Sequence, residues 1–133
     1  MAVTIEKILF LRQMDFFDGV ADDALADLMA ICMEKNFKNG EVVAVPEENQ
    51  TCWYIVLDGI LDVFDGDELI DSITPFHPFG EEYVFNPNPC GITAKARGTT
   101  VCLTVNKETL SHLLVLHPSL NEVFLARLSQ KKS

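Results

Sequence analysis

The sequence predicts a mainly β fold of the α+β class, in which helices flank an antiparallel set of strands. Apolar residues recur at helical spacing near both ends of the chain, whereas the stretch 39–105 consists of short β-branched or aromatic runs. Asn-Gly, Asp-Gly and Arg-Gly pairs, the last at Arg97-Gly98, separate these runs, as in tight turns between neighbouring strands. Many short strands at this spacing are typical of a barrel or a sandwich.

Length and charge limit the function. A chain of 133 residues with 48% hydrophobic content suits one domain with one core, so we expect a single domain over 1–133. Twenty acidic residues against ten basic ones give a formal charge of -10, which repels nucleic acid. No apolar run approaches the roughly 20 residues that cross a bilayer, and the first residues lack a secretory pattern. We expect neither nucleic-acid binding nor direct membrane insertion.

The cysteines indicate a reducing compartment. They form no C-x-x-C pair and no zinc-binding spacing. We therefore expect reduced, mostly buried thiols in a cytoplasmic protein. The residues concerned are Cys32, Cys52, Cys90 and Cys102.

The N-terminal region, 1–38, is expected to be helical. A short helix-like pattern covers 4–11, and Phe16 and Phe17 precede an Asp-Gly turn. An amphipathic helix is expected over 22–33, with two aspartates in its first turn, where carboxylates suit the helix dipole.

The strand region is expected over 39–105. Its clearest hairpin is the Phe-Asp-Gly-Asp sequence at 64–67. The expected strands are 41–45, 52–57, 60–64, 68–73, 92–97 and 100–105.

Two helices are expected over 106–130. Asn106 is a suitable N-cap for the first helix, and Pro118 ends it and opens the second. The apolar stripes and strand faces also predict a set of buried side chains. These are Leu28, Tyr54, Val56, Phe79, Leu110, Leu113 and Phe124.

The most informative motif is the run FGEEYVFNPNPCGITAKA, which begins at Phe79. It resembles the phosphate-binding cassette of the cyclic nucleotide-binding domain family. In that family a glutamate after Phe-Gly takes the ribose 2′-hydroxyl, and an arginine takes the cyclic phosphate. This chain has Glu81 at the glutamate position and keeps Pro89 and Thr93, but Cys90 stands where the arginine is expected.

The resemblance runs from about Ile5 to Leu128 and implies an antiparallel β-roll, a jelly-roll-like double-stranded β-helix. It implies cAMP or cGMP, or another small anion, as the ligand. It also implies a second protein domain or subunit as a partner, including a second copy in a homodimer. The candidate ligand-binding residues by resemblance are Phe79, Gly80, Glu81, Glu82, Cys90, Gly91, Ile92 and Thr93.

The missing arginine predicts weak binding of cyclic nucleotides. The planar fork of arginine makes two charge-assisted hydrogen bonds to a phosphate, and loss of one partner of such a buried pair costs about 2–5 kcal/mol. A neutral thiol is only a weak donor. Lys95 and Arg97 are the nearest cations in the sequence, but strand alternation places them opposite Ile92 and, by parity, Cys90.

Three functions therefore stay open. The first is a non-enzymatic regulatory module with weak or absent cyclic nucleotide binding. The second is a working cAMP or cGMP sensor in which another cation or backbone amides replace the arginine. The third is a small cupin-like enzyme, for which the sequence offers no metal triad, nucleophile–base pair or phosphate loop. His77, His112 and His117 lack the strand-based His-x-His grouping of a metal site. His112 and His117 lie in or beside an expected helix, so these two are expected on the surface.

Overall fold

The computed structural model describes residues 4–44, 52–81 and 92–132. The helices are α1 (Thr4–Arg12), the 3-10 turn η1 (Asp15–Phe17), α2 (Asp22–Ile31), α4 (Lys107–Leu116) and α5 (Pro118–Lys132). The strands are β1 (Met33–Phe37), β2 (Val42–Ala44), β3 (Cys52–Asp65), β4 (Glu68–Ile73), β5 (Pro78–Phe79) and β6 (Ile92–Asn106). The expected α+β class, with helices at both ends of the strand region, is confirmed.

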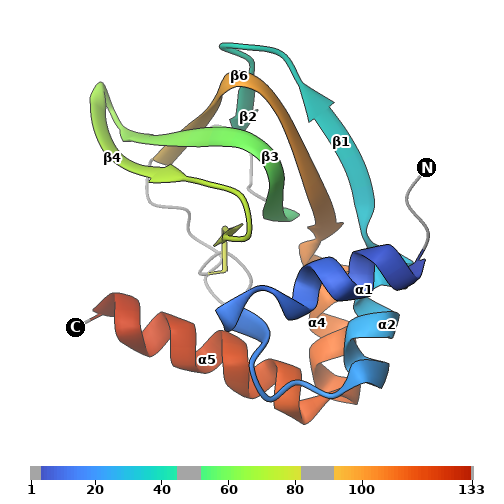
Figure 1. The fold of residues 1–133 in the computed structure, drawn as a ribbon. Coiled ribbons are helices and arrows are strands. Elements are labelled where there is room, and N and C mark those ends of the chain that lie inside the picture. The colour runs from blue at the N-terminus through green and yellow to red at the C-terminus, as the bar shows by residue number, and fades with distance from the viewer. Residues whose placement is uncertain (1–3, 45–51, 82–91, 133) are drawn as a thin grey trace.

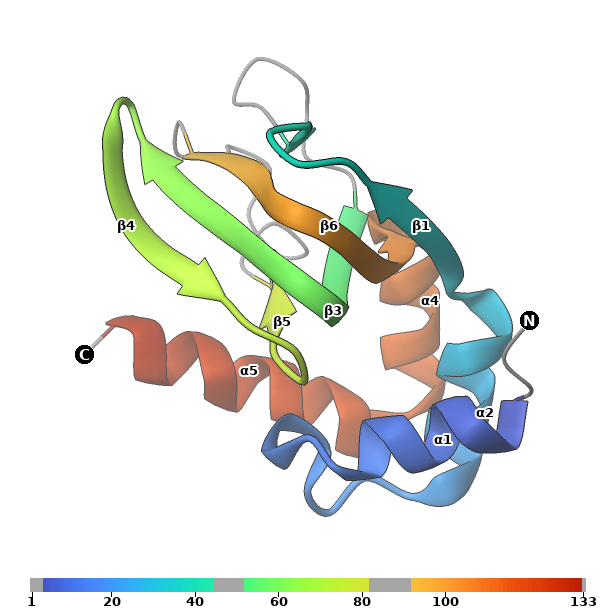
Figure 2. The same ribbon diagram turned by 45° about the horizontal axis from the view of Figure 1, so that its top comes forward.

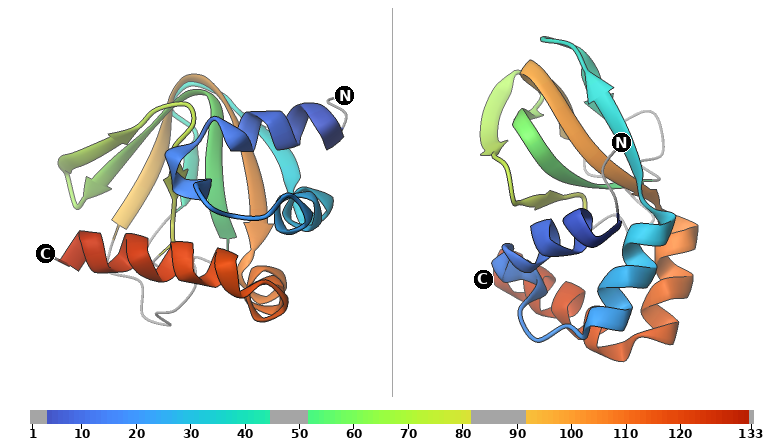
Figure 3. Two further views of the ribbon diagram at one scale, coloured as in Figure 1. Left: turned by 60° about the horizontal axis from the view of Figure 1, so that its bottom comes forward. Right: turned by 45° about the vertical axis from the view of Figure 1, so that its right-hand side comes forward.

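The strands form one curved sheet in the order β1-β6-β3-β4, in which β2 also pairs with β6 and β5 with β3. Every pairing is antiparallel. The sheet curls over on itself, and all the labelled helices gather on one side of it (Figures 1 and 2). The N-terminal helices and α5 thus close one side of the roll (Figure 3).

Two Gly-containing pairs were expected to be turns between strands but lie inside long strands. Gly59, at φ +85°, lies within β3, and Gly98, at φ +73°, lies within β6. The two strands pair along most of their length, and their register shifts around Gly59. A Cβ on Gly59 would lie 2.5 Å from Thr100 Oγ1, so close strand approach as well as backbone conformation requires glycine.

Strand β1 was not expected from the sequence. The helix predicted over 22–33 ends at Ile31, and Met33–Phe37 then pairs with β6. Four of the five side chains of β1 are exposed, so this strand lacks the apolar alternation by which half-buried strands are recognised. Strand β1 is therefore defined by its hydrogen bonds to β6 and not by a pattern in its side chains.

Other local predictions are confirmed. The β3–β4 hairpin turns at Gly66, which has φ +62°. The side chain of Asn106 accepts a hydrogen bond from the backbone N–H of Thr109 at 2.8 Å, which caps α4. Helix α5 begins at Pro118.

The apolar side chains form two clusters instead of the single expected core. The helix-side cluster joins the helices to one face of the strands, and the roll cluster fills the interior of the roll. Trp53 and Ile55 belong to the helix-side cluster, whereas Tyr54 and Val56 belong to the roll cluster, because successive side chains of β3 point to opposite faces. All seven side chains predicted to be core are buried.

No helix in the described ranges is long and apolar enough to cross a membrane.

Candidate functional site

Five of the eight candidate ligand-binding residues lie in the described part of the chain. They are Phe79, Gly80, Glu81, Ile92 and Thr93. Glu82, Cys90 and Gly91 lie outside the described residues. The site can therefore be built from its two edges, the end of β5 and the start of β6.

Strand β5 anchors the first edge. Phe79 pairs with Tyr54 of β3, and its ring lies 6.2 Å from the Tyr54 ring within the roll cluster. Gly80 follows with φ +100°, a conformation that side chains rarely adopt. The chain turns at this point and carries Glu81 out of the strand.

Glu81 is fully buried, with 0% of its surface exposed. The indole Nε1–H of Trp53 donates to Glu81 Oε1 at 3.2 Å. Arg127 Nε of helix α5 lies 3.4 Å from Glu81 Oε2, an ion pair that does not meet hydrogen-bond geometry. A buried carboxylate requires such partners, because desolvation penalises the charge.

The partners of Glu81 come from the helix side of the sheet. Trp53 packs in the helix-side cluster, where its ring lies 4.9 Å from that of Phe124 on α5. Arg127 follows Phe124 by three residues, so the two side chains share one face of α5. The carboxylate thus links β3, the end of β5 and α5.

Arg127 is the cation nearest to Glu81 among the described residues. It was not identified from the sequence, where only the cations close to the motif, Lys95 and Arg97, were considered. Neither Trp53 nor Arg127 is among the candidate site residues that the sequence indicated. The three-residue spacing between Phe124 and Arg127 is the signal that could have placed the arginine on the buried face.

The second edge follows the predicted alternation. Ile92 and Ala94 are buried towards the roll interior, Thr93 is half-buried, and Lys95 and Arg97 are exposed. These two cations therefore face solvent on the opposite side of β6, as expected.

Arg97 is engaged by an aspartate on the neighbouring strand. Arg97 Nη2 lies 2.8 Å from Asp62 Oδ1, and Ser72 Oγ also donates to Asp62 at 2.8 Å. The hydrogen bonds from Arg97 are the main cause that lowers the pKa of Asp62; partial burial opposes them, and the hydrogen bond from Ser72 lowers the pKa further. This group forms a surface brace across β4, β3 and β6.

The remaining histidines and cysteines among the described residues do not form a second cluster. His77 Nδ1 lies 3.2 Å from Thr74 Oγ1, and His117 Nε2 lies 2.8 Å from Asp27 Oδ2. Burial raises the pKa of the Cys102 thiol to about 12, which leaves it protonated and unreactive. Within the described residues, no group of three histidine, cysteine or acidic side chains could hold a metal ion.

Comparison with known proteins assigns the family. A model of the cyclic nucleotide-binding domain matches residues 34–117, which is more than half of the chain. A cGMP-dependent protein kinase from Plasmodium berghei (strain Anka) is 26% identical over 109 residues, which is 82% of this chain. The match spans 13% of the kinase, so the chain corresponds to a small part of that protein.

Solved structures share the fold. The sensor domain of the transcriptional regulator DNR from Pseudomonas aeruginosa has a TM-score of 0.79 at 20% identity and covers 93% of this chain and 91% of its own. The cAMP-bound PfPKA-R structure has a TM-score of 0.75 at 18% identity, with 95% and 49% covered. The catabolite activator protein of Thermus thermophilus has a TM-score of 0.79 at 18% identity, with 87% and 57% covered.

Proposed function

Since the chain belongs to the cyclic nucleotide-binding domain family, we propose that it is a non-enzymatic, single-domain regulatory module that binds cAMP and cGMP weakly. It acts in the cytoplasm on a partner domain or subunit. The similar proteins support cyclic nucleotides as the ligand class, since one of them is a cGMP-dependent protein kinase and another is the cAMP-bound PfPKA-R. Two features of this chain support weak binding.

The observation that carries the proposal is the buried environment of Glu81. The carboxylate that the family uses for the ribose hydroxyl is occupied by Trp53 and Arg127 of the same chain. A carboxylate has about four acceptor positions, so a ribose hydroxyl is not excluded. The ribose hydroxyl would have to bind a Glu81 carboxylate whose charge is already compensated by Trp53 and Arg127. The free energy gained on binding is therefore smaller.

The second feature is Cys90. Removing a charge pair worth about 3 kcal/mol from a micromolar binder gives a dissociation constant on the order of 10⁻⁴ M or weaker. The net charge of -10 acts in the same direction, because it opposes a nucleotide anion.

The contact between Glu81 and Arg127 also offers an output. Arg127 lies on α5, so a ligand that draws the Glu81 carboxylate away from the helix side weakens the attachment of α5. A partner domain that contacts α5 would then sense the change. The protein would then shift between an arrangement in which Glu81 pairs with Arg127 and one in which Glu81 contacts the ligand, because the ligand has a higher affinity for the second.

Calorimetric titration tests the proposal. The unaltered chain is titrated with cAMP and cGMP beside the Cys90→Arg variant, and 5′-AMP serves as a control ligand for nonspecific nucleotide binding. We expect weak binding by the unaltered chain and a gain of roughly tens- to thousands-fold for Cys90→Arg. Micromolar binding by the unaltered chain contradicts weak binding, and no gain in the variant shows that the pocket itself is lost.

The position of Arg127 favours a second candidate, a working sensor in which Arg127 serves as the replacement cation. Its side chain is 35% exposed and lies beside the residue expected to take the ribose. The Arg127→Gln variant separates the two functions. If Arg127 restrains Glu81, the variant binds cAMP more tightly than the unaltered chain does, and if Arg127 holds the phosphate, the variant binds it more weakly.

A further inference from the structure

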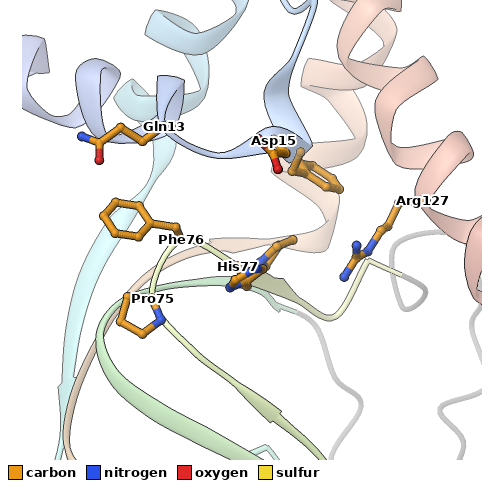
Figure 4. Close-up of a pocket in the computed structure, with 8 residues that line it drawn as sticks. Gln13, Asp15, Pro75, Phe76, His77 and Arg127 are labelled. Carbon is orange, nitrogen blue, oxygen red and sulfur yellow. The ribbon is translucent and has the colours of Figure 1, made fainter.

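A cavity of about 400 Å³ lies outside the roll, between the N-terminal helices, the β4–β5 connection and α5 (Figure 4). Its size falls within the roughly 300–1,000 Å³ of small-molecule sites. The lining residues that matter for binding are Gln13, Asp15, Phe16, Phe76, His77 and Arg127.

The cavity has aromatic walls. Phe76 is 38% exposed, and its ring stacks on that of Phe10 at a centroid distance of 4.6 Å and an interplanar angle of 26°. Phe16 lines the cavity from η1 and packs edge-on against Phe124 of α5. A stacked, half-exposed phenyl ring favours a flat aromatic ligand, which can extend the stack.

The segment that presents Phe76 is held in a strained conformation. Phe76 has φ +73°, the only positive φ of a non-glycine residue in the described ranges. Its N–H donates to Val56 O at 3.0 Å, and the N–H of Val56 donates to His77 O at 3.1 Å. These two bonds to β3 fix the wall in place, and strain of this kind concentrates at ligand-binding positions.

The polar groups of the cavity lie apart from one another. Arg127 approaches from α5, while Gln13 and Asp15 approach from the N-terminal segment (Figure 4). The Nε atom of Arg127 is buried without a hydrogen-bond acceptor among the described residues. Because Nε is buried beside Glu81, the two Nη groups of the guanidinium are the donors for a ligand carboxylate, and Asp15 and Gln13 can accept from a donor on the ligand.

We propose that this cavity is a second ligand site, which binds a small planar aromatic carboxylate that also carries an amino donor. The ring lies against Phe76 and Phe16, the carboxylate accepts from Arg127, and the amino group donates to Asp15. Because Arg127 also pairs with Glu81, an occupant of this cavity alters the environment of Glu81 and of its other partner, Trp53. This site goes beyond the proposed function and does not require cyclic nucleotide binding.

Nuclear magnetic resonance titration with 4-aminobenzoate tests the proposal. We expect saturable shifts of the backbone amides of Gln13, Phe76 and His77, and of the single indole N–H, which belongs to Trp53. Aniline lacks the carboxylate and benzoate lacks the donor, so each should bind at least about tenfold more weakly. No saturable shift up to about 10 mM probe, or shifts confined to the roll interior, overturns the proposal.

Variants place the probe in the cavity. Phe76→Ala should weaken binding of 4-aminobenzoate about tenfold or more, because the ring supplies the stacking surface. Leu125→Ala, on an exposed part of α5, serves as the control and should leave binding unchanged. If Phe76→Ala does not fold, Gln13→Ala replaces it, since Gln13 is exposed at the end of α1 and should also weaken binding. Unchanged affinity in the folded variant overturns the proposal.

Discussion

Trp53 donates its indole N–H to the carboxylate of Glu81 at 3.2 Å, across 28 residues of chain. Trp53 lies in β3, and Glu81 follows β5, so the bond fixes the end of the candidate site against the central strand. Arg127 then connects the same carboxylate to α5. A single buried charge thus joins the strand, the candidate site and the last helix.

Loss of the indole donor should destabilise the fold. In Trp53→Phe, the buried Glu81 carboxylate loses the indole hydrogen bond, so the free energy of unfolding should fall by about 1–3 kcal/mol beyond any loss of packing. Urea denaturation measures the change. Tyr54→Phe is the matched control, since it removes a weaker 3.3 Å bond to Val43 O and should cost about 1 kcal/mol. Equal costs for the two variants would show that the contact with Glu81 adds nothing.

Truncation of Leu113 should be costly. The side chain is 6% exposed in the helix-side cluster, so Leu113→Ala should lower the free energy of unfolding by about 2–5 kcal/mol. Val115→Ala, two residues further along α4 and 79% exposed, should change it by less than about 0.5 kcal/mol. Chemical denaturation of both variants checks the difference, and a stable Leu113→Ala variant would mean that α4 packs by another face.

Gly59 should tolerate substitution less well than Gly66. Both have positive φ, but only at Gly59 would a Cβ meet other atoms, at 2.5 Å from Thr99 O and Thr100 Oγ1. Gly59→Ala should cost about 2–5 kcal/mol, since strain and overpacking add, whereas Gly66→Ala should cost about 1–2 kcal/mol. Thermal or urea unfolding compares them, and similar costs would show that the strands move apart without penalty.

The Asp62–Arg97 pair should make stability depend on pH. Hydrogen bonds from Arg97 lower the pKa of Asp62 below its ordinary value near 3.8. Its contribution is therefore fully present above pH 3.8 and is lost as the pH falls through the lowered value in the folded protein.

When the pH is lowered from about 6 to about 3, across the ordinary pKa values of carboxyl groups, the Asp62→Asn variant should lose less stability than the unaltered chain. Urea midpoints at the two pH values measure this loss, with Glu34→Gln on the exposed strand β1 as the control. An equal loss in the unaltered chain and in Asp62→Asn would contradict the assignment.

The sequence predicted the order and type of most elements, because the hydrophobic period changes from helical to strand-like near residue 39 and back near 106. It did not predict that β3 continues through Gly59 and β6 through Gly98. A glycine that follows a polar residue is found both in tight turns and in bent strands, so the sequence does not distinguish the two. The irregular pairing around Gly59 also changes which side chains face the roll, so Leu61 and Val63 join Tyr54 in the roll cluster.

The candidate site was predicted only in part. The motif at Phe79 marked Glu81, and alternation correctly placed Lys95 and Arg97 on the solvent side. The partners of Glu81 come from positions 28 residues before it and 46 residues after it, and only tertiary packing brings them together. No local pattern encodes such a contact, although the shared helix face of Phe124 and Arg127 is consistent with it.

The environment of Glu81 is the central structural claim behind the proposed function, and the indole N–H signal of Trp53 tests it most directly. It is the one tryptophan of the chain, so its ¹H–¹⁵N signal is assigned by inspection. Glu81→Gln replaces a charged acceptor with a weaker neutral one, so the indole proton should move upfield and exchange faster with solvent. Arg127→Gln should also move it, whereas Arg12→Gln, whose partner is Asp22, should not. An indole signal unchanged in Glu81→Gln would contradict the account.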